Sequence, residues 1–79
     1  MNQNKNQVII LTGGNGLIGS EVIKLLRSRG ATVINFDLEN IDNEKDFVQC
    51  NIIQADSISK SVSDVIKKYG KIDGLVNNA

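Results

Sequence analysis

The feature that most constrains the fold is the segment over residues 8–19, which reads V-I-I-L-T-G-G-N-G-L-I-G. Four consecutive aliphatic residues without polar alternation are typical of a parallel strand that is covered on both faces. Four glycines then fall within seven residues, and the last two are interleaved with the start of a helical apolar pattern. The segment therefore predicts a strand, a glycine turn and a helix, in that order.

A turn of this kind suits a diphosphate, because the first turn of a helix leaves N–H groups unpaired and carries about half a positive charge. We expect Gly13 and Gly14 to form the turn and Gly16 to face a pyrophosphate, while Gly19 packs the helix against the strand. The glycines match the general fingerprint G-x-G-x-x-G and, with Thr12, a narrower T-G-x-x-G-x-x-G version. A tight turn without a ligand has the same pattern, so the remaining sequence must decide.

Two amphipathic helices and four short strands account for most of the chain. The apolar spacing predicts helices over residues 17–29 and from 56 or 57 to 69, with Gly30 and Gly70 as caps. Strands are predicted over residues 8–11, 31–36, 47–50 and 74–77. The stripes expected to face the sheet are Ile18, Val22, Leu25 and Leu26 in the first helix, and Ile58, Val62, Val65, Ile66 and Tyr69 in the second.

The alternation of strands and helices predicts right-handed βαβ units. We expect the α/β class and part of a doubly wound Rossmann fold, with a parallel four-stranded sheet of order 3-2-1-4 and one long helix on each face. Residues 38–46 are polar and acidic, so we expect a loop with at most one helical turn. A crevice is expected beyond the carboxyl ends of strands 1 and 4, where the winding reverses.

Length and composition are consistent with one small domain. Residues 1–7 are a polar lead-in, and residues 8–79 are expected to be the N-terminal part of a dinucleotide-binding domain, truncated after its fourth strand. Nine basic residues balance nine acidic ones, which gives no basis for binding nucleic acid or an anionic membrane. Cys50 is the only cysteine and histidine is absent, so we expect no metal site. No segment has the length of a membrane span, and the polar start predicts a cytoplasmic protein.

Asp37 follows the second strand and lies 18 residues after Gly19, close to the spacing of about 20 expected for the acidic residue that binds the adenosine ribose. Its carboxylate can accept hydrogen bonds from both ribose hydroxyls. A 2′-phosphate would meet it as a like charge, at about 4 kcal/mol for unit charges 4 Å apart in an effective dielectric of 20. No Arg or Lys neighbours Asp37 in the sequence, so we predict NAD rather than NADP. The alternative is a loop aspartate that only begins a turn.

The sequence resembles the short-chain dehydrogenases/reductases over nearly all of the chain after residue 7. The resemblance rests on T-G-G-N-G-L-I-G at residues 12–19, Asp37, C-N-I at residues 50–52, and G-K-I-D-G-L-V-N-N-A at residues 70–79. The last segment is the most specific, because N-N-A after an apolar strand is a mark of this family. Two departures are present: the glycine spacing looks like the extended, nucleotide-sugar branch, and residue 51 is usually aspartate, so the asparagine there lacks the charge.

The resemblance implies a cofactor site at the carboxyl ends of the strands. The residues it implies are Gly13, Asn15, Leu17 and Ile18 for the diphosphate and its ribose, Asn51 and Ile52 for the adenine, and Asn77, Asn78 and Ala79 for the middle of the cofactor. Asn78 is further implied to brace the central strands, with Thr12 bonding nearby backbone. Asn77 and Asn78 could instead be turn formers, although two amides there would be costly to bury without partners.

No catalytic residue is expected within the chain. The family's reaction uses a tyrosine and a lysine four residues apart on a later helix, whereas Tyr69, the only tyrosine, has Asp73 four residues on. Tyr69 also lies on the apolar stripe of its helix, so we interpret it as a packing residue. Without histidine or a Tyr/Lys pair, the chain offers no general acid or base for hydride transfer.

We therefore predict the NAD-binding half of a short-chain oxidoreductase, which would transfer a hydride between nicotinamide and a carbonyl or alcohol carbon of a small-molecule substrate. The chain alone is not expected to turn over, its fourth strand is expected to leave an unpaired apolar edge, and a homo-oligomeric parent is compatible with the prediction. The alternatives are a non-catalytic NAD-binding regulatory module and a fragment of an NAD-dependent nucleotide-sugar epimerase or dehydratase.

Overall fold

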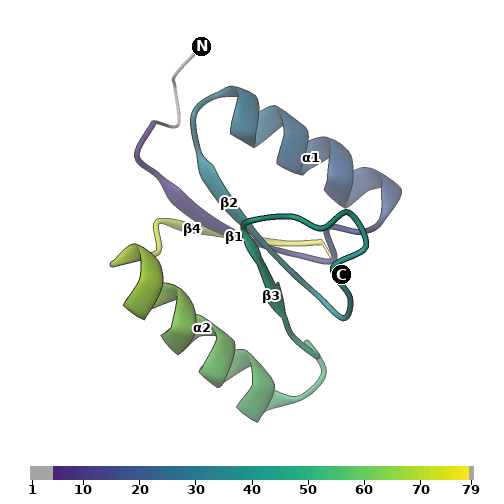
Figure 1. The fold of residues 1–79 in the computed structure, drawn as a ribbon, viewed down its shortest axis with the longest axis vertical. Helices are drawn as coiled ribbons and strands as arrows, with labels where there is room; N and C mark the ends of the chain where they lie inside the picture. The colour runs from purple at the N-terminus through teal and green to yellow at the C-terminus, as the bar shows by residue number, and fades with distance from the viewer. Residues whose placement is uncertain (1–4, 79) are drawn as a thin grey trace.

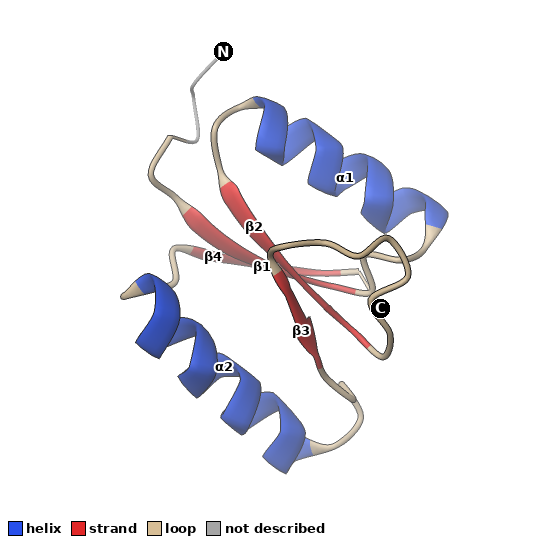
Figure 2. Ribbon diagram, in the orientation of Figure 1, coloured by secondary structure: helices blue, strands red, loops and turns tan. Residues whose placement is uncertain are grey.

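The computed structural model describes residues 5–78, and the predicted site residue Ala79 lies outside this range. The elements in chain order are β1 (Val8–Thr12), α1 (Leu17–Ser28), β2 (Thr32–Asp37), β3 (Phe47–Gln49), α2 (Ala55–Tyr69) and β4 (Gly74–Asn77). The strands form one parallel sheet of order β3-β2-β1-β4, and the two helices lie on opposite faces of it (Figure 1). Figure 2 shows the resulting three layers. The predicted class, strand order and layering are confirmed.

The register of the sheet brings the predicted site residues to one edge. β1 pairs with β2 on one side and with β4 on the other, so that Thr12 is level with Phe36 and Asn77. Parallel strands point the same way, so the residues that follow their carboxyl ends lie near one another. The glycine turn after β1, Asp37 at the end of β2 and Asn78 after β4 therefore share one end of the sheet.

The face of α1 that packs on the sheet differs from the predicted stripe. Gly19 and Ile23 are the buried residues of α1, whereas Ile18 is 70% exposed and Leu25 is half exposed. Ile23 is 4% exposed and joins a core cluster with Ile9, Leu11, Ala31 and Val33, against which Val22 and Leu26 also pack. Residues 19 and 23 are one helical turn apart, so the face that brings Gly19 close to the loop also buries Ile23. The assignment of Ile18 and Leu25 to the buried stripe was wrong.

The face of α2 is also rotated relative to the prediction. Val65 and Ser61 are buried, Val62 and Tyr69 pack partly, and Ile58 and Ile66 remain exposed. The cluster beneath α2 contains Val8, Ile10, Ile34, Phe36 and Cys50 together with Val65. Cys50 is 2% exposed within this cluster.

The helix ends agree with the sequence in part. α2 begins at Ala55, before the predicted start at residue 56 or 57, and its N-cap residue makes no side-chain cap hydrogen bond. The chain before α2 is stabilised instead by Asn51, whose Oδ1 accepts from the Ile53 N–H at 3.2 Å and whose N–H donates to Ser57 Oγ at 3.1 Å. Gly70 ends α2 in the left-handed conformation, as predicted.

Residues 38–46 form an ordered loop without a helix, as predicted. Asn40 closes it, because its Oδ1 accepts from the Glu44 N–H at 2.7 Å and its Nδ2 donates to the Glu44 carbonyl at 2.9 Å. The loop then joins the sheet through the N–H of Asn35, which donates to the Asp46 carbonyl at 3.0 Å. These bonds place Glu44 beside β2.

An apolar groove of about 550 Å³ remains between α2 and β4. Leu75 of β4 is 66% exposed, and no strand within residues 5–78 pairs with the outer edge of β4. The structure therefore has the unpaired apolar edge that the sequence predicted. The residues that line the groove are Ile10, Thr12, Ile52, Ile53, Ile58, Val62, Ile72, Leu75 and Asn77.

Candidate cofactor site

The glycine turn begins at Gly13, which takes a left-handed conformation with φ of 73°. Its N–H donates to the Phe36 carbonyl at 2.9 Å, and its own carbonyl accepts from the Gly16 N–H at 3.3 Å. A residue with a Cβ atom is strained at this φ, so the position favours glycine. The turn therefore holds the start of α1 against the end of β2.

Gly14 and Gly19 are required by packing. A Cβ atom at Gly14 would lie 2.4 Å from Asn35 Oδ1, and one at Gly19 would lie 2.5 Å from the Gly13 carbonyl oxygen. The packing role predicted for Gly19 is confirmed. Gly14 lies within the turn, as predicted. Its N–H donates to Asn35 Oδ1 at 2.9 Å, so this N–H group points into the protein and not toward solvent.

Open N–H donors begin with the first residues of α1. The N-cap Gly16 offers no side-chain hydrogen bond, and the first amide bonded back to the turn is that of Ser20, which donates to the Gly16 carbonyl at 2.9 Å. Within the described residues, the N–H groups of Leu17, Ile18 and Gly19 have no hydrogen-bond partner, and of these three residues Leu17 and Ile18 are exposed while Gly19 is buried. Unpaired amides at a helix N-terminus form a surface on which an anion is stabilised.

Asp37 faces the glycine turn. Its Oδ2 accepts from the Asn15 N–H at 3.0 Å, and its Oδ1 accepts from the Leu38 N–H at 2.8 Å. A carboxylate has about four acceptor positions, so each oxygen can accept a further hydrogen bond. The side chain of Asn15 is also held, because its Nδ2 donates to the Glu39 carbonyl at 2.7 Å.

A hollow of about 210 Å³ lies beside Asp37, and the predicted adenine residues line it. Asn51 contributes polar atoms, although its Oδ1 already accepts one hydrogen bond from the Ile53 N–H at 3.2 Å. Phe36 and Cys50 form the buried base of the hollow. The full lining is Gly13, Phe36, Asp37, Leu38, Cys50, Asn51, Ile52 and Ile53.

The end of β4 is tied to the end of β1. The Thr12 hydroxyl donates a hydrogen bond to Asn77 Oδ1 at 3.1 Å. The same hydroxyl oxygen accepts a hydrogen bond from the Asn78 N–H at 3.1 Å. Asn78 Nδ2 donates to the Gly13 carbonyl at 3.1 Å. These contacts give Thr12 and Asn78 the bracing roles that the resemblance implied.

A buried polar network beneath the turn was not predicted. Asn35 is fully buried in β2 and contacts Gly14, Asn15 and Glu44. Glu44 in turn forms an ion pair with Arg27 of α1 at 2.9 Å. The sequence contains one indication of this network: Asn35 is the single polar residue in the apolar segment over residues 33–36.

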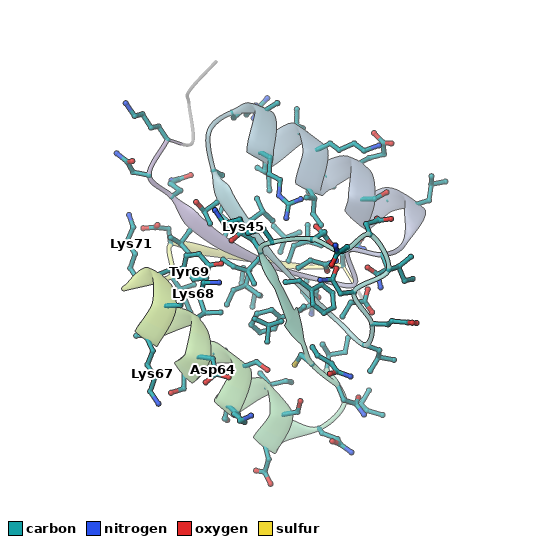
Figure 3. The ribbon with its side chains drawn as sticks, in the orientation of Figure 1. Lys45, Asp64, Lys67, Lys68, Tyr69 and Lys71 are labelled. Atoms are coloured by element: carbon teal, nitrogen blue, oxygen red, sulfur yellow. The ribbon has the colours of Figure 1, made fainter. Side chains whose placement is uncertain are left out.

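Tyr69 lies away from this site, at the carboxyl end of α2 (Figure 3). It packs against the core beneath α2, and its hydroxyl donates a hydrogen bond to Asp46 Oδ1. Burial, with the hydrogen bond to Asp46, raises the pKa of Tyr69 to about 12. Lys68 Nζ lies 5.3 Å from the centre of its ring. The interpretation of Tyr69 as a packing residue is confirmed.

Two other kinds of site are not found in the part of the chain that the structure describes. No group of three or more His, Cys, Asp or Glu side chains is placed to hold a metal ion. Neither helix combines the length and the apolar character that a membrane span requires.

Comparison with known proteins shows the family of the chain. A family model described as short chain dehydrogenase matches residues 7–79. The chain belongs to this family. Sorbitol-6-phosphate 2-dehydrogenase of Klebsiella pneumoniae is 35% identical in an alignment that covers 95% of this chain and 30% of that protein. The 3-oxoacyl-[acyl-carrier-protein] reductase of Thermotoga maritima is 36% identical in an alignment that covers 95% of this chain and 35% of that protein.

Solved structures of the same family share the fold. Ligand-free aldohexose dehydrogenase of Thermoplasma acidophilum superposes with a TM-score of 0.89 at 30% identity, over 95% of this chain and 30% of that one. The Cj0485 dehydrogenase superposes with a TM-score of 0.88 at 32% identity, over all of this chain and 35% of that one. The chain thus spans about a third of the length of its relatives. Short-chain dehydrogenases are oxidoreductases that use NAD or NADP.

Proposed function

We propose that this chain binds NAD and is the N-terminal, cofactor-binding part of an oxidoreductase that transfers a hydride between nicotinamide and a carbonyl or alcohol carbon. The observation that carries the proposal is the arrangement around the glycine turn. The open amides of Leu17 and Ile18 and the carboxylate of Asp37 lie at one end of the sheet, linked through Asn15, whose N–H donates to Asp37. The open amides favour an anion such as a diphosphate, and the carboxylate favours the vicinal hydroxyls of a ribose.

Each predicted residue has a distinct task in this proposal. Gly13 and Gly16 keep side chains away from the diphosphate, while Asn77, Asn78 and Ala79 line the middle of the cofactor. Asn51 and Ile52 border the adenine in the hollow beside Asp37. The bound nicotinamide supplies the hydride chemistry, and the protein contributes binding and orientation.

The preference for NAD over NADP depends on Asp37. Its carboxylate would accept from the ribose hydroxyls of NAD but would face the 2′-phosphate of NADP as a like charge. The residues that follow it, Leu38 and Glu39, supply no positive charge. We therefore expect a 2′-phosphate to be rejected at this position.

The general acid and base of the reaction are proposed to lie outside these 79 residues, so that the chain alone does not turn over. Tyr69 is committed to Asp46 and to core packing, and it lies at the far end of the sheet from the glycine turn. The relatives compared above are dehydrogenases and a reductase. Their chemistry supports hydride transfer on a small-molecule substrate over the epimerase and dehydratase alternative, and over a module that only binds NAD.

The test is an equilibrium titration of the chain with NADH and with NADPH, followed by nicotinamide fluorescence. The unmodified chain is expected to bind NADH more tightly. Asp37→Ser should reduce the preference for NADH at least about tenfold, which corresponds to about 1.4 kcal/mol. Asp64→Ser is the matched control, because it removes an exposed carboxylate on α2 and should leave the preference unchanged. Equal preference ratios in Asp37→Ser and in the unmodified chain would remove Asp37 from the ribose site.

A further inference from the structure

A fully buried amide lies directly beneath the glycine turn. Asn35 Oδ1 accepts from the Gly14 N–H at 2.9 Å, and Asn35 Nδ2 donates to Asn15 Oδ1 at 3.1 Å and to Glu44 Oε2 at 2.8 Å. A buried amide is costly unless its donors and acceptor are paired, and here each of them is. Both turn residues that it contacts belong to the candidate cofactor site.

Glu44 determines which way this amide points. A carboxylate only accepts hydrogen bonds, so the NH₂ group of Asn35 must face Glu44 and its oxygen must face Gly14. Glu44 is itself fixed by Arg27, whose Nη1 lies 2.9 Å from Glu44 Oε1 and whose Nη2 donates to the Val33 carbonyl at 2.9 Å. The Glu44 side chain is 13% exposed, so this ion pair is shielded from solvent on one side. The charge pair therefore locks the orientation of the Asn35 amide.

The oriented amide has two effects on the site. It satisfies the Gly14 N–H inside the protein, so the donors left open toward solvent are those of Leu17 and Ile18. It also holds Asn15 by its side-chain oxygen, and the N–H of Asn15 donates to Asp37 Oδ2 at 3.0 Å. Asn35 thus contacts the turn directly and reaches the carboxylate of Asp37 only through Asn15.

We infer that Asn35 is a positioning residue for the dinucleotide, which sets the glycine turn and, through Asn15, the ribose carboxylate of Asp37. Glu44 and Arg27 support it by fixing the orientation of its amide. This inference rests on the proposed function, because it assigns a role toward the same cofactor. Asn35 is fully buried, so we assign it no direct contact with the cofactor.

The binding test compares two variants with a control that removes one hydrogen bond at the other end of the sheet. Glu44→Gln removes the negative charge that, together with the Gly14 N–H, orients the Asn35 amide. Asn35→Leu leaves the Gly14 N–H and the Glu44 carboxylate without their partner. Both should weaken NADH binding, by about tenfold or more for Asn35→Leu. Tyr69→Phe removes one hydrogen bond at the far end of the sheet and should leave NADH binding unchanged.

Amide hydrogen exchange without ligand gives the second readout. Exchange of the Gly14 amide should become about tenfold faster in Asn35→Leu, measured against Ile10 in the buried β1 strand of the same chain. In Tyr69→Phe the ratio of the two exchange rates should not change. If Asn35→Leu fails to fold, the ratio of the Gly14 to the Ile10 exchange rate in Glu44→Gln tests the positioning role instead.

The outcomes separate this inference from the proposed function. Selective loss of NADH binding and of Gly14 protection in the Asn35 and Glu44 variants supports the positioning role. If the unmodified chain binds NADH and these variants lose no more affinity than Tyr69→Phe, the positioning role is overturned while the proposed function stands. If the unmodified chain binds neither NADH nor NADPH, the proposed function fails and the positioning role fails with it.

Discussion

The two ends of the sheet use polar groups in different ways. At the amino end, the Val8 N–H donates to Asp73 Oδ2 at 2.7 Å, Asp73 pairs with Lys71 at 3.1 Å, and the Tyr69 hydroxyl donates to Asp46. At the carboxyl end, a comparable set of bonds holds the turn but leaves the first amides of α1 open.

The difference teaches where to look for a ligand. Polar contacts at the amino end connect one element to the next, and each can be explained by stability alone. Those at the carboxyl end fix a backbone whose first helical amides stay open toward solvent, where an anion would be stabilised. The comparison makes different predictions for substitutions at the two ends.

The largest effect is expected for Gly19→Ala at the carboxyl end. Its Cβ atom would lie 2.5 Å from the Gly13 carbonyl oxygen, which is backbone and cannot move without displacing the turn. We expect a loss of about 3 kcal/mol in the free energy of unfolding, measured by urea denaturation, together with loss of NADH binding. Gly74→Ala is the control, because its nearest neighbour would be Ile9 Cγ1 at 3.8 Å. Equal stability of the two variants would contradict the close packing of α1.

A smaller effect is expected for Tyr69→Phe at the amino end. The loss of the hydrogen bond to Asp46 should reduce the free energy of unfolding by about 1 kcal/mol, and the NADH affinity should stay the same. A parallel loss of NADH affinity would show that the two ends are not independent.

The single tyrosine also gives a spectroscopic test of its surroundings. Its pKa is raised to about 12 in the folded chain, so the phenol form is stabilised, and the stability this adds below pH 10 is lost as the pH rises from 10 to 12. Absorbance at alkaline pH should show a phenolate midpoint near 12 in the folded chain and near 10 in urea. The same midpoint in both conditions would place the hydroxyl in water.

The smallest effect is expected for Asp73→Asn. The Val8 N–H, and then Lys71, lower the pKa of the Asp73 carboxyl, so its contribution is present above the pKa of the unfolded chain and is lost as the pH falls through the folded value. The urea midpoint of the variant should therefore fall less than that of the unmodified chain between pH 7 and pH 3. Asp64→Asn, which removes an exposed carboxylate on α2, is the matched control. An identical acid dependence in Asp73→Asn would show that the contact with Val8 carries no stability.

The sequence predicted the elements and their order because these depend on local patterns. Alternating apolar segments and glycine turns define the strands and helices, and the chain connections then define the sheet order. Asp37 could be placed beside the glycine turn for the same reason, because both follow neighbouring parallel strands.

The buried face of α1 was predicted wrongly and the Asn35 network was not predicted, because both depend on contacts between residues that are distant in the sequence. α1 carries aliphatic residues on several sides, and its buried face was decided by the close approach of Gly19 to Gly13, which favours Ile23 over Ile18. The Asn35 network could not be predicted, since its partner Glu44 lies in an irregular loop whose path is set by its own Asn40 contacts.

The most direct test of the account follows backbone amides of the chain by NMR during addition of NAD. Shifts concentrated at Leu17 and Ile18, with the amides of Val8 and Gly70 unmoved, are the predicted result. Shifts concentrated at the amino end of the sheet, or none at saturating NAD, would contradict a dinucleotide site at the glycine turn.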